Sequence, residues 1–107
     1  MYQDGWIWDY AGLDNGLNEL FATQDEVSNN HADFSVGQFD KLANAGKAQP
    51  DKAKSAALYA QAETILLDNA GIIPLWWAKN QEVVSAKVDT YPKTGFGFAE
   101  FALVTLK

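Results

Sequence analysis

The sequence has 107 residues, which is enough for at most one domain. Its net charge of −6 and its lack of arginine disfavour nucleic acid as a partner, because phosphates are bound mainly by Lys and Arg. The lack of cysteine excludes disulfides, zinc–thiolate sites and a cysteine nucleophile. The sequence contains no apolar run as long as a transmembrane helix requires.

Residues 1–10 are rich in aromatic side chains and alternate loosely, which predicts a short strand over residues 4–9. A glycine-containing turn follows. Apolar residues at helical spacing then predict a helix near residues 14–23, with Asp14 as its N-cap. The polar segment over residues 23–35 is predicted to be an exposed loop.

Two further helices are predicted in the middle of the chain. The first is expected near residues 36–46, with Ser35 as its N-cap and Gly46 at its end. The second and longest is expected near residues 51–69, with Asp51 as its N-cap. Its expected apolar face consists of Leu58, Ala62, Ile65 and Leu66, and its polar face of Lys52, Ser55 and Glu63.

The last third of the chain changes from helical spacing to extended patterns. An apolar run predicts a buried strand over residues 72–78, in which one of Trp76 and Trp77 faces inward and the other lines a surface. Two more strands are predicted near residues 82–88 and 99–106. The whole pattern predicts an α+β fold with about three helices and four short strands.

Few residues of this sequence suggest catalysis. The single histidine, His31, lies in a polar loop and is more consistent with a solvated side chain than with a catalytic one. His31 and Asp33 together offer only two candidate metal ligands, so we expect no metal site and no cofactor. A small hydrolase that uses a pair of carboxylates stays open as a weaker alternative, because separations in space cannot be inferred from the sequence.

The stretch GWIWDY, residues 5–10, sets one carboxylate among three large aromatic rings. In a strand, Trp6 and Trp8 would share a face opposite Ile7 and Asp9. Packing in a core is the more common role for each tryptophan taken alone. The alternative is a surface on which a ligand lies against the rings and meets the charge of Asp9.

The order of four short motifs resembles the C-terminal part of the family 5 extracellular solute-binding proteins. The motifs are Gly5-Trp6-x-x-Asp9-Tyr10, Phe39-Asp40-x-Leu42, Tyr59-x-x-Ala62-Glu63 and Ile73-Pro74-Leu75-Trp76. Each motif is short, and the specificity of the resemblance lies in their order over nearly the whole sequence. The sequence departs from the family pattern after Tyr10, where two prolines and an acid are missing, and at Ser55, where the family usually has Arg.

The resemblance implies that the chain is a fragment of an α/β periplasmic-binding-protein-like fold. Residues 1–79 would form the C-terminal part of one ligand-binding lobe, and residues 80–107 would cross back to the other lobe. It also implies non-catalytic binding of a solute, most often a peptide, outside the cytoplasm, with an ABC permease as partner. No export signal is present in this sequence, so we expect the signal on a missing N-terminal part of the same protein.

The resemblance also indicates the ligand-binding residues. In peptide-binding members the acid of the first motif pairs with the α-amino group of the ligand, a role that falls on Asp9, with Trp6 lining the cleft. Trp8 is a further candidate for the cleft wall on its aromatic character alone. We expect the aromatic rings to shield Asp9 from water, and this desolvation would strengthen its ion pair with the ligand.

The competing interpretation is a free-standing α+β interaction domain whose aromatic side chains lie in a core or an interface. It predicts a stable monomer or dimer with no cleft and with residues 5–10 buried. For a fragment, in contrast, strand edges left without a neighbour would favour self-association.

Overall fold

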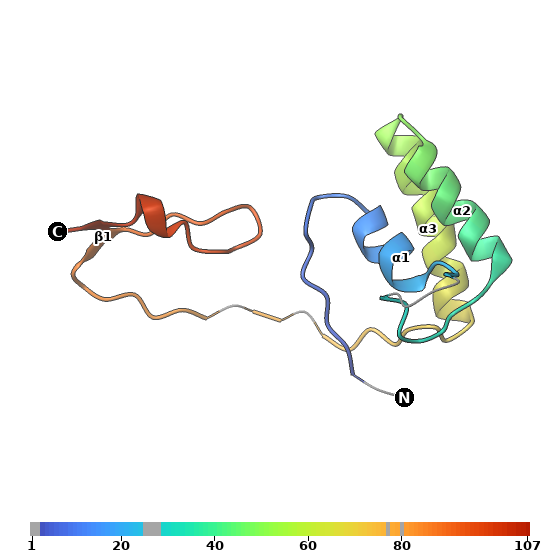
Figure 1. The fold of residues 1–107 in the computed structure, drawn as a ribbon, viewed down its shortest axis with the longest axis horizontal. Helices are drawn as coiled ribbons and strands as arrows, with labels where there is room; N and C mark the ends of the chain where they lie inside the picture. The colour runs from blue at the N-terminus through green and yellow to red at the C-terminus, as the bar shows by residue number, and fades with distance from the viewer. Residues whose placement is uncertain (1–2, 25–28, 77, 80) are drawn as a thin grey trace. The chain divides into compact units, whose positions relative to one another are not determined.

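A computed structural model describes residues 3–24, 29–76, 78–79 and 81–107. The chain divides into two compact units, Met1–Pro74 and Leu75–Lys107. Within the described ranges, the first unit contains three helices and the second a small antiparallel sheet, so the predicted α+β class is confirmed (Figure 1). Among the described residues, no helix has the length and apolar character needed to cross a bilayer.

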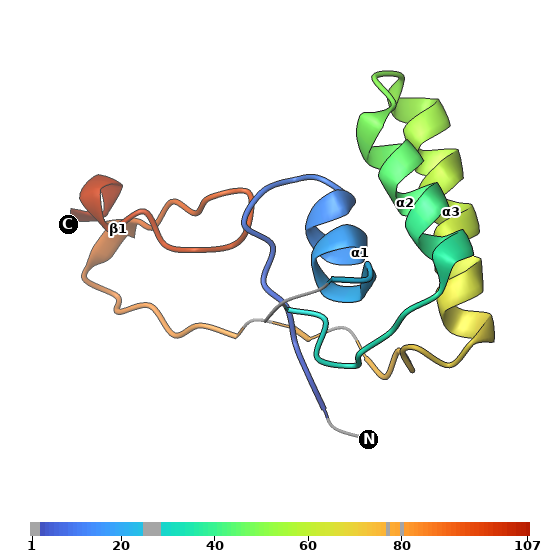
Figure 2. The ribbon, with the colours of Figure 1, turned by 45° about the vertical axis from the view of Figure 1, so that its right-hand side comes forward.

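The first unit consists of α1 (Asp14–Phe21), α2 (Gly37–Ala48) and α3 (Lys52–Asp68). Helices α2 and α3 lie side by side and run in opposite directions, joined by a short turn (Figures 1 and 2). Helix α1 packs against α2. All three helices fall within a few residues of their predicted positions.

The predicted N-caps of α1 and α2 are wrong. Leu13 occupies the N-cap of α1 and Val36 that of α2, and neither makes a side-chain cap bond. Asp14 lies one residue further on, in the first turn of α1, where its negative charge still complements the helix dipole. Oγ of Ser35 lies 3.1 Å from Oγ1 of Thr23, so this contact ties two loop ends together, and the Ser35 side chain does not cap α2.

Gly46 does not end α2, which continues to Ala48. A Cβ atom on Gly46 would lie 2.9 to 3.1 Å from ring carbons of Tyr59, so the glycine is required for close contact between α2 and α3. Ser55 belongs to the same contact, because its hydroxyl donates to the carbonyl of Gly46 at 2.7 Å. Ser55 therefore faces α2, which corrects its predicted place on the polar face of α3.

Both ends of α3 are capped. The side chain of Asp51 accepts hydrogen bonds from the N–H groups two and three residues further on, as predicted. At the other end, the N–H of Ala70 donates to the carbonyl of Leu67 and that of Gly71 to the carbonyl of Leu66, at 3.0 and 2.9 Å. This pair of bonds is a Schellman motif, with Ala70 in the left-handed region at a φ of 51°.

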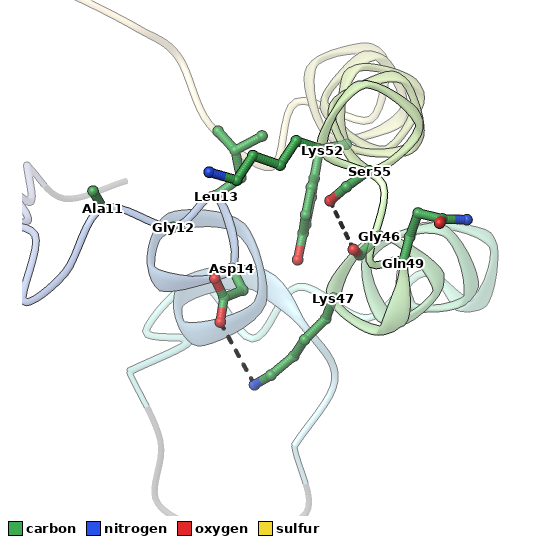
Figure 3. A pocket seen from close by; sticks show the side chains of 10 residues that line it. Ala11, Gly12, Leu13, Asp14, Gly46, Lys47, Gln49, Lys52 and Ser55 are labelled. Carbon is green, nitrogen blue, oxygen red and sulfur yellow. Dashed lines mark hydrogen bonds and ion pairs between the residues drawn. The ribbon is translucent and has the colours of Figure 1, made fainter.

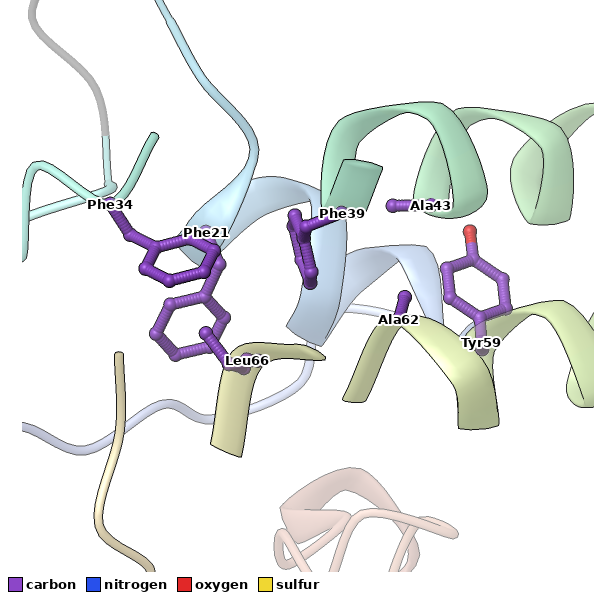
Figure 4. Close-up of a cluster of buried hydrophobic side chains, with 7 residues drawn as sticks. All are labelled: Phe21, Phe34, Phe39, Ala43, Tyr59, Ala62 and Leu66. Carbon is purple, nitrogen blue, oxygen red and sulfur yellow. The ribbon is translucent and has the colours of Figure 1, made fainter. Parts of the chain in front are cut away.

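The core of the first unit is made of aromatic and aliphatic side chains from the three helices and from the loop before α2 (Figure 4). Its buried members are Phe21, Phe34, Phe39, Ala43, Tyr59, Ala62 and Leu66. The rings of Phe34 and Phe39 meet edge to face with their centroids 5.3 Å apart. Tyr59 was not part of the predicted apolar face of α3, whereas Leu58 was and is only half-buried.

Most of the predicted strands are not formed. Residues 4–9, residues 82–87 and the described part of 72–78 have no strand partner in the part of the chain that the structure describes. Alternating apolar residues favour extended backbone, but a strand also needs a neighbour for its N–H and C=O groups. Trp76 is exposed, and Trp77 lies outside the described residues, so the inward ring stays a prediction.

The sheet of the second unit has two strands. β1 (Val88–Thr90) pairs antiparallel with β2 (Thr105–Leu106), and the 3₁₀ turn η1 (Phe101–Leu103) precedes β2. The predicted strand over residues 99–106 is therefore correct only at its end. The predicted strand over residues 82–88 contributes only its last residue.

Candidate functional site

One side chain from α1, that of Asn15, holds both Trp6 and Asp9 of the aromatic segment. Asn15 is 2% exposed, and its Oδ1 accepts hydrogen bonds from Trp6 Nε1 and from the backbone N–H of Asp9, both at 3.0 Å. Its Nδ2 donates to Oδ2 of Asp9 at 3.2 Å. The ring of Trp6 and the carboxylate of Asp9 are thus fixed by the same amide group.

Trp6 and Asp9 were expected on opposite faces of a strand, and this arrangement is wrong. The segment is not a strand, so its side chains do not alternate, and both reach Asn15. Trp6 is half-buried, and because its indole N–H is used by Asn15, the ring can offer a ligand only its faces and edges. Asp9 is exposed, so this chain alone does not provide the expected shielding of its carboxylate.

Trp8 lies against the first turns of α1. A Cβ atom on Gly16 would be 3.1 Å from the indole ring, so the ring is in close contact with the bare helix backbone. The side chain is 38% exposed. This packing accounts for one side of the ring, and its role as a wall of a ligand site stays a prediction.

Tyr10 extends the polar contacts of the segment toward the start of α1. Its hydroxyl donates to Oδ2 of Asp14 at 2.7 Å. This hydrogen bond to a carboxylate raises the pKa of Tyr10, because the bond favours the protonated phenol. The same oxygen of Asp14 lies 4.0 Å from Nζ of Lys47 on α2.

A hollow of about 330 Å³ lies where α1 begins, α2 ends and α3 begins (Figure 3). Its polar lining includes Asp14, Lys47, Gln49, Lys52 and Ser55. The predicted ligand-binding residues are not among those that line it. Within the described residues, no buried side-chain nitrogen or oxygen lacks a hydrogen-bond partner.

His31 takes part in a contact with Asp4 at the surface. Its Nδ1 lies 3.0 Å from Oδ2 of Asp4, and both side chains are about half exposed. The hydrogen bond to His31 is the main reason why the pKa of Asp4 is lowered. Across the described ranges, no group of three His, Asp or Glu side chains is placed to hold a metal ion.

The motif Phe39-Asp40-x-Leu42 contributes to the core and to the connection between α1 and α2. Phe39 is fully buried in the core. Asp40 accepts hydrogen bonds from the N–H and the hydroxyl of Thr23, at 2.8 and 2.6 Å. These bonds tie the segment that leaves α1 to the first turn of α2.

The motif Tyr59-x-x-Ala62-Glu63 is likewise structural. Tyr59 and Ala62 are buried against α2, and the hydroxyl of Tyr59 donates to Oδ1 of Asn18 at 2.8 Å. Nδ2 of Asn18 in turn donates to Oδ1 of Asn44 at 3.1 Å, so a chain of polar bonds links all three helices. Desolvation by burial, with a smaller contribution from the charge of Asp14, raises the pKa of Tyr59 to about 12.

Comparison with known proteins bears on the competing interpretations. The chain is 31% identical over 97 residues to "Heme-binding protein A" of Haemophilus influenzae, a match that covers 91% of this chain and 18% of that protein. It is 29% identical over 97 residues to "Di/tripeptide-binding protein 3" of Pseudomonas aeruginosa, a match that covers 86% of this chain and 18% of that protein. The chain is a sequence relative of the family 5 extracellular solute-binding proteins. A "Dipeptide-binding protein" of P. aeruginosa is 34% identical over 71 residues, covering 66% of this chain and 13% of that protein.

The chain therefore spans less than a fifth of the length of the curated relatives it matches. No protein-family profile matches it. No solved structure matches it either. The relatives are named as binding proteins, as expected for a non-catalytic solute-binding relative, and this weakens the hydrolase alternative.

Proposed function

We propose that this chain is part of a non-catalytic solute-binding protein that delivers its ligand to an ABC permease outside the cytoplasm. The observation that carries the proposal is the similarity to binding proteins, which extends over 91% of the chain in the heme-binding relative. Short peptides are the proposed ligand class, because the relatives from P. aeruginosa are named for dipeptides or tripeptides.

We further propose that the chain is the C-terminal portion of such a protein. Residues 1–79 contribute to one lobe, and residues 80–107 cross to the other. The exposed apolar side chains support this assignment, since Trp76 is 66% exposed and Phe101 is 77% exposed. Apolar surface of this kind normally marks an interface. The missing N-terminal part of the same protein is the proposed cover, and without it the unpaired strand edges favour self-association.

The gene itself tests the fragment proposal. We expect an open reading frame that extends several hundred codons upstream of Met1 and begins with an export signal. A start codon at Met1 that initiates translation in a reporter assay would instead support the free-standing interaction domain.

Asp9 is the proposed receptor for the ligand's α-amino group, with Trp6 and Trp8 beside it. One oxygen of Asp9 bonds to Asn15, and the exposed carboxylate leaves room for an ammonium group. We propose that the rest of the protein closes over this position and removes water, which strengthens the ion pair.

Calorimetry on the complete polypeptide, with alanyl-alanine and trialanine as probes, tests this role. Asp9→Asn should weaken binding of these peptides by about 2–5 kcal/mol, the usual cost of removing one partner of a desolvated pair. Asp14→Asn is the matched control, because it makes the same change on a carboxylate that is bonded to Tyr10. An unchanged affinity in Asp9→Asn removes Asp9 from the proposed role.

The isolated chain should bind these peptides very weakly, since it supplies only part of the proposed cleft. A clear micromolar titration with the chain alone would contradict the need for the rest of the protein.

A further inference from the structure

The amide group of Asn15 can take only one orientation. Its Oδ1 accepts two N–H donors, from the indole of Trp6 and from the backbone of Asp9, both at 3.0 Å. Turning the amide by 180° would place its NH₂ group against both donors and lose both bonds. Nδ2 must therefore point at the carboxylate of Asp9, where it donates to Oδ2 at 3.2 Å.

This geometry constrains the carboxylate of Asp9 from two sides. The backbone N–H of Asp9 and one of its carboxylate oxygens are bonded to a side chain that is 2% exposed and sits on a helix. Among the described residues, the structure shows a hydrogen bond to Oδ2 of Asp9 and none to Oδ1, and the residue is exposed, so one oxygen is held by the protein and the other is left for a ligand. A group fixed in this way loses less conformational freedom when it binds a ligand.

We propose that Asn15 is the positioning residue of the amine site: it orients Asp9 so that Oδ1 meets an incoming ammonium group, and it holds the Trp6 ring beside that oxygen. This inference rests on the proposed role of Asp9. Asn15 is itself buried and acts through Asp9 without touching the ligand.

The variant Asn15→Asp tests the inference. It keeps an acceptor for Trp6 and for the N–H of Asp9, but it replaces the donor with a second carboxylate beside that of Asp9. Two carboxylates this close share a proton, and a bound cation favours release of that proton. In the complete polypeptide, affinity for alanyl-alanine and trialanine should therefore rise at least about fivefold, relative to the wild-type profile, between about pH 5 and pH 8.

Asn18→Asp is the matched control. Asn18 lies one turn further along α1, is also buried, accepts a bond from Tyr59 and donates one to Asn44. The variant therefore keeps an acceptor and loses a donor, at a position where the structure shows no bond to Asp9. Its pH profile of peptide affinity should run parallel to that of the wild type. Parallel profiles for both variants would show that position 15 is not coupled to the amine site, and this result would overturn the inference.

A measurement on the wild type covers the case in which Asn15→Asp does not fold. In protein labelled with ¹⁵N at asparagine, the side-chain amide signals of Asn15 should shift on addition of alanyl-alanine but not of its N-acetylated form, while those of Asn18 should not move. If Asp9→Asn weakens binding but Asn15 gives neither the pH effect nor the shift, the inference fails and the proposed function stands. If the wild type binds neither peptide, the peptide function and the inference fail together.

Discussion

Tyr59 shows how one residue can serve both the core and a polar network. Its ring lies against the backbone of Gly46, where any side chain would collide, and its hydroxyl bonds to Asn18 on a different helix. The ring is 3% exposed, so neither the phenol nor the Asn18 oxygen can readily exchange its partner for water. The site candidates Trp6 and Asp9 depend on this helix staying in place, because both are bonded to Asn15.

Tyr59→Phe should therefore destabilise the chain by about 1–3 kcal/mol, because it leaves the buried Oδ1 of Asn18 without its donor. Chemical denaturation measures the change in the free energy of unfolding. Tyr10→Phe is the control: Tyr10 is exposed and its bond to Asp14 is solvated, so the loss should be below about 0.5 kcal/mol. Equal losses of unfolding free energy in the two variants would show that the buried hydrogen bond stabilises the chain no more than the exposed one.

The raised pKa of Tyr59 also predicts a dependence of stability on pH. The folded value is about 12, above the ordinary value of 10, so the unfolded chain loses its phenolic proton first. The contribution of Tyr59 to stability is complete below pH 10 and is lost as the pH rises from 10 to about 12. The free energy of unfolding, measured by chemical denaturation at each pH in this range, should fall more steeply with pH for the wild type than for Tyr59→Phe. An equal pH dependence in the two proteins would contradict the assignment.

At the level of elements, the end of α3 places two small residues in demanding positions. Ala70 adopts the left-handed conformation that normally favours glycine, at a φ of 51°. Gly71, the next residue, has no room for a side chain, since a Cβ would lie 2.6 Å from both Leu66 Cδ1 and the ring of Phe34. Backbone conformation therefore limits which residues are tolerated at position 70, and packing limits which are tolerated at position 71.

This arrangement predicts opposite effects for two neighbouring substitutions. Ala70→Gly should stabilise the chain by about 0.5 kcal/mol, because it relieves the left-handed strain at some cost in chain entropy. Gly71→Ala should destabilise it by about 1–3 kcal/mol, because the new methyl group overpacks the contact with Phe34 and Leu66. Thermal unfolding of the two variants beside the wild type measures both signs, and destabilisation by both changes would refute the account of Ala70.

The elements also show which features can be predicted from sequence. The three helices were predictable because helical spacing is a local property, and Asp51 was recognisable as a cap from its place before the apolar run. Gly46 was misinterpreted because glycine is found both at helix ends and at close helix contacts, and only the position of Tyr59 distinguishes the two. Three strands were predicted wrongly because pairing depends on a second segment that the local pattern does not contain.

The candidate site was predicted only in part. The motif named Trp6 and Asp9, and the structure brings both to the same side chain. It did not point to Asn15, because a buried asparagine near the start of a helix looks in sequence like an ordinary capping or turn residue. The alternation assumed for residues 5–10 also concealed the contact, since it placed Trp6 and Asp9 on opposite faces.

At the scale of the whole molecule, the two units differ in how much apolar surface they bury. Among the described residues, the first has a core of seven buried side chains, whereas the second presents exposed side chains such as Val83, Phe101 and Leu106. A two-stranded sheet of this size is marginally stable in water. The second unit therefore resembles one side of an interface more than an independent domain.

Hydrogen exchange on the chain should reflect this difference. Amide groups in the buried turns of α2 and α3, around Phe39 and Tyr59, should be the most protected, and those of β1 and β2 should exchange at least about tenfold faster, because local opening of a small sheet costs little free energy. Mass spectrometry or NMR measures the rates. Comparable protection in the two units at low protein concentration would show that the second unit is stable by itself.

The bond between the indole of Trp6 and the amide of Asn15 has a practical consequence. Indole emission responds to the hydrogen bond of its N–H group, and the side-chain amide of Asn15 that accepts this bond also donates to Asp9. Any cation that draws the carboxylate of Asp9 toward itself would alter the surroundings of this chromophore. The segment that is proposed to bind the ligand would then act as its own optical reporter, and binding could be followed by fluorescence without a label.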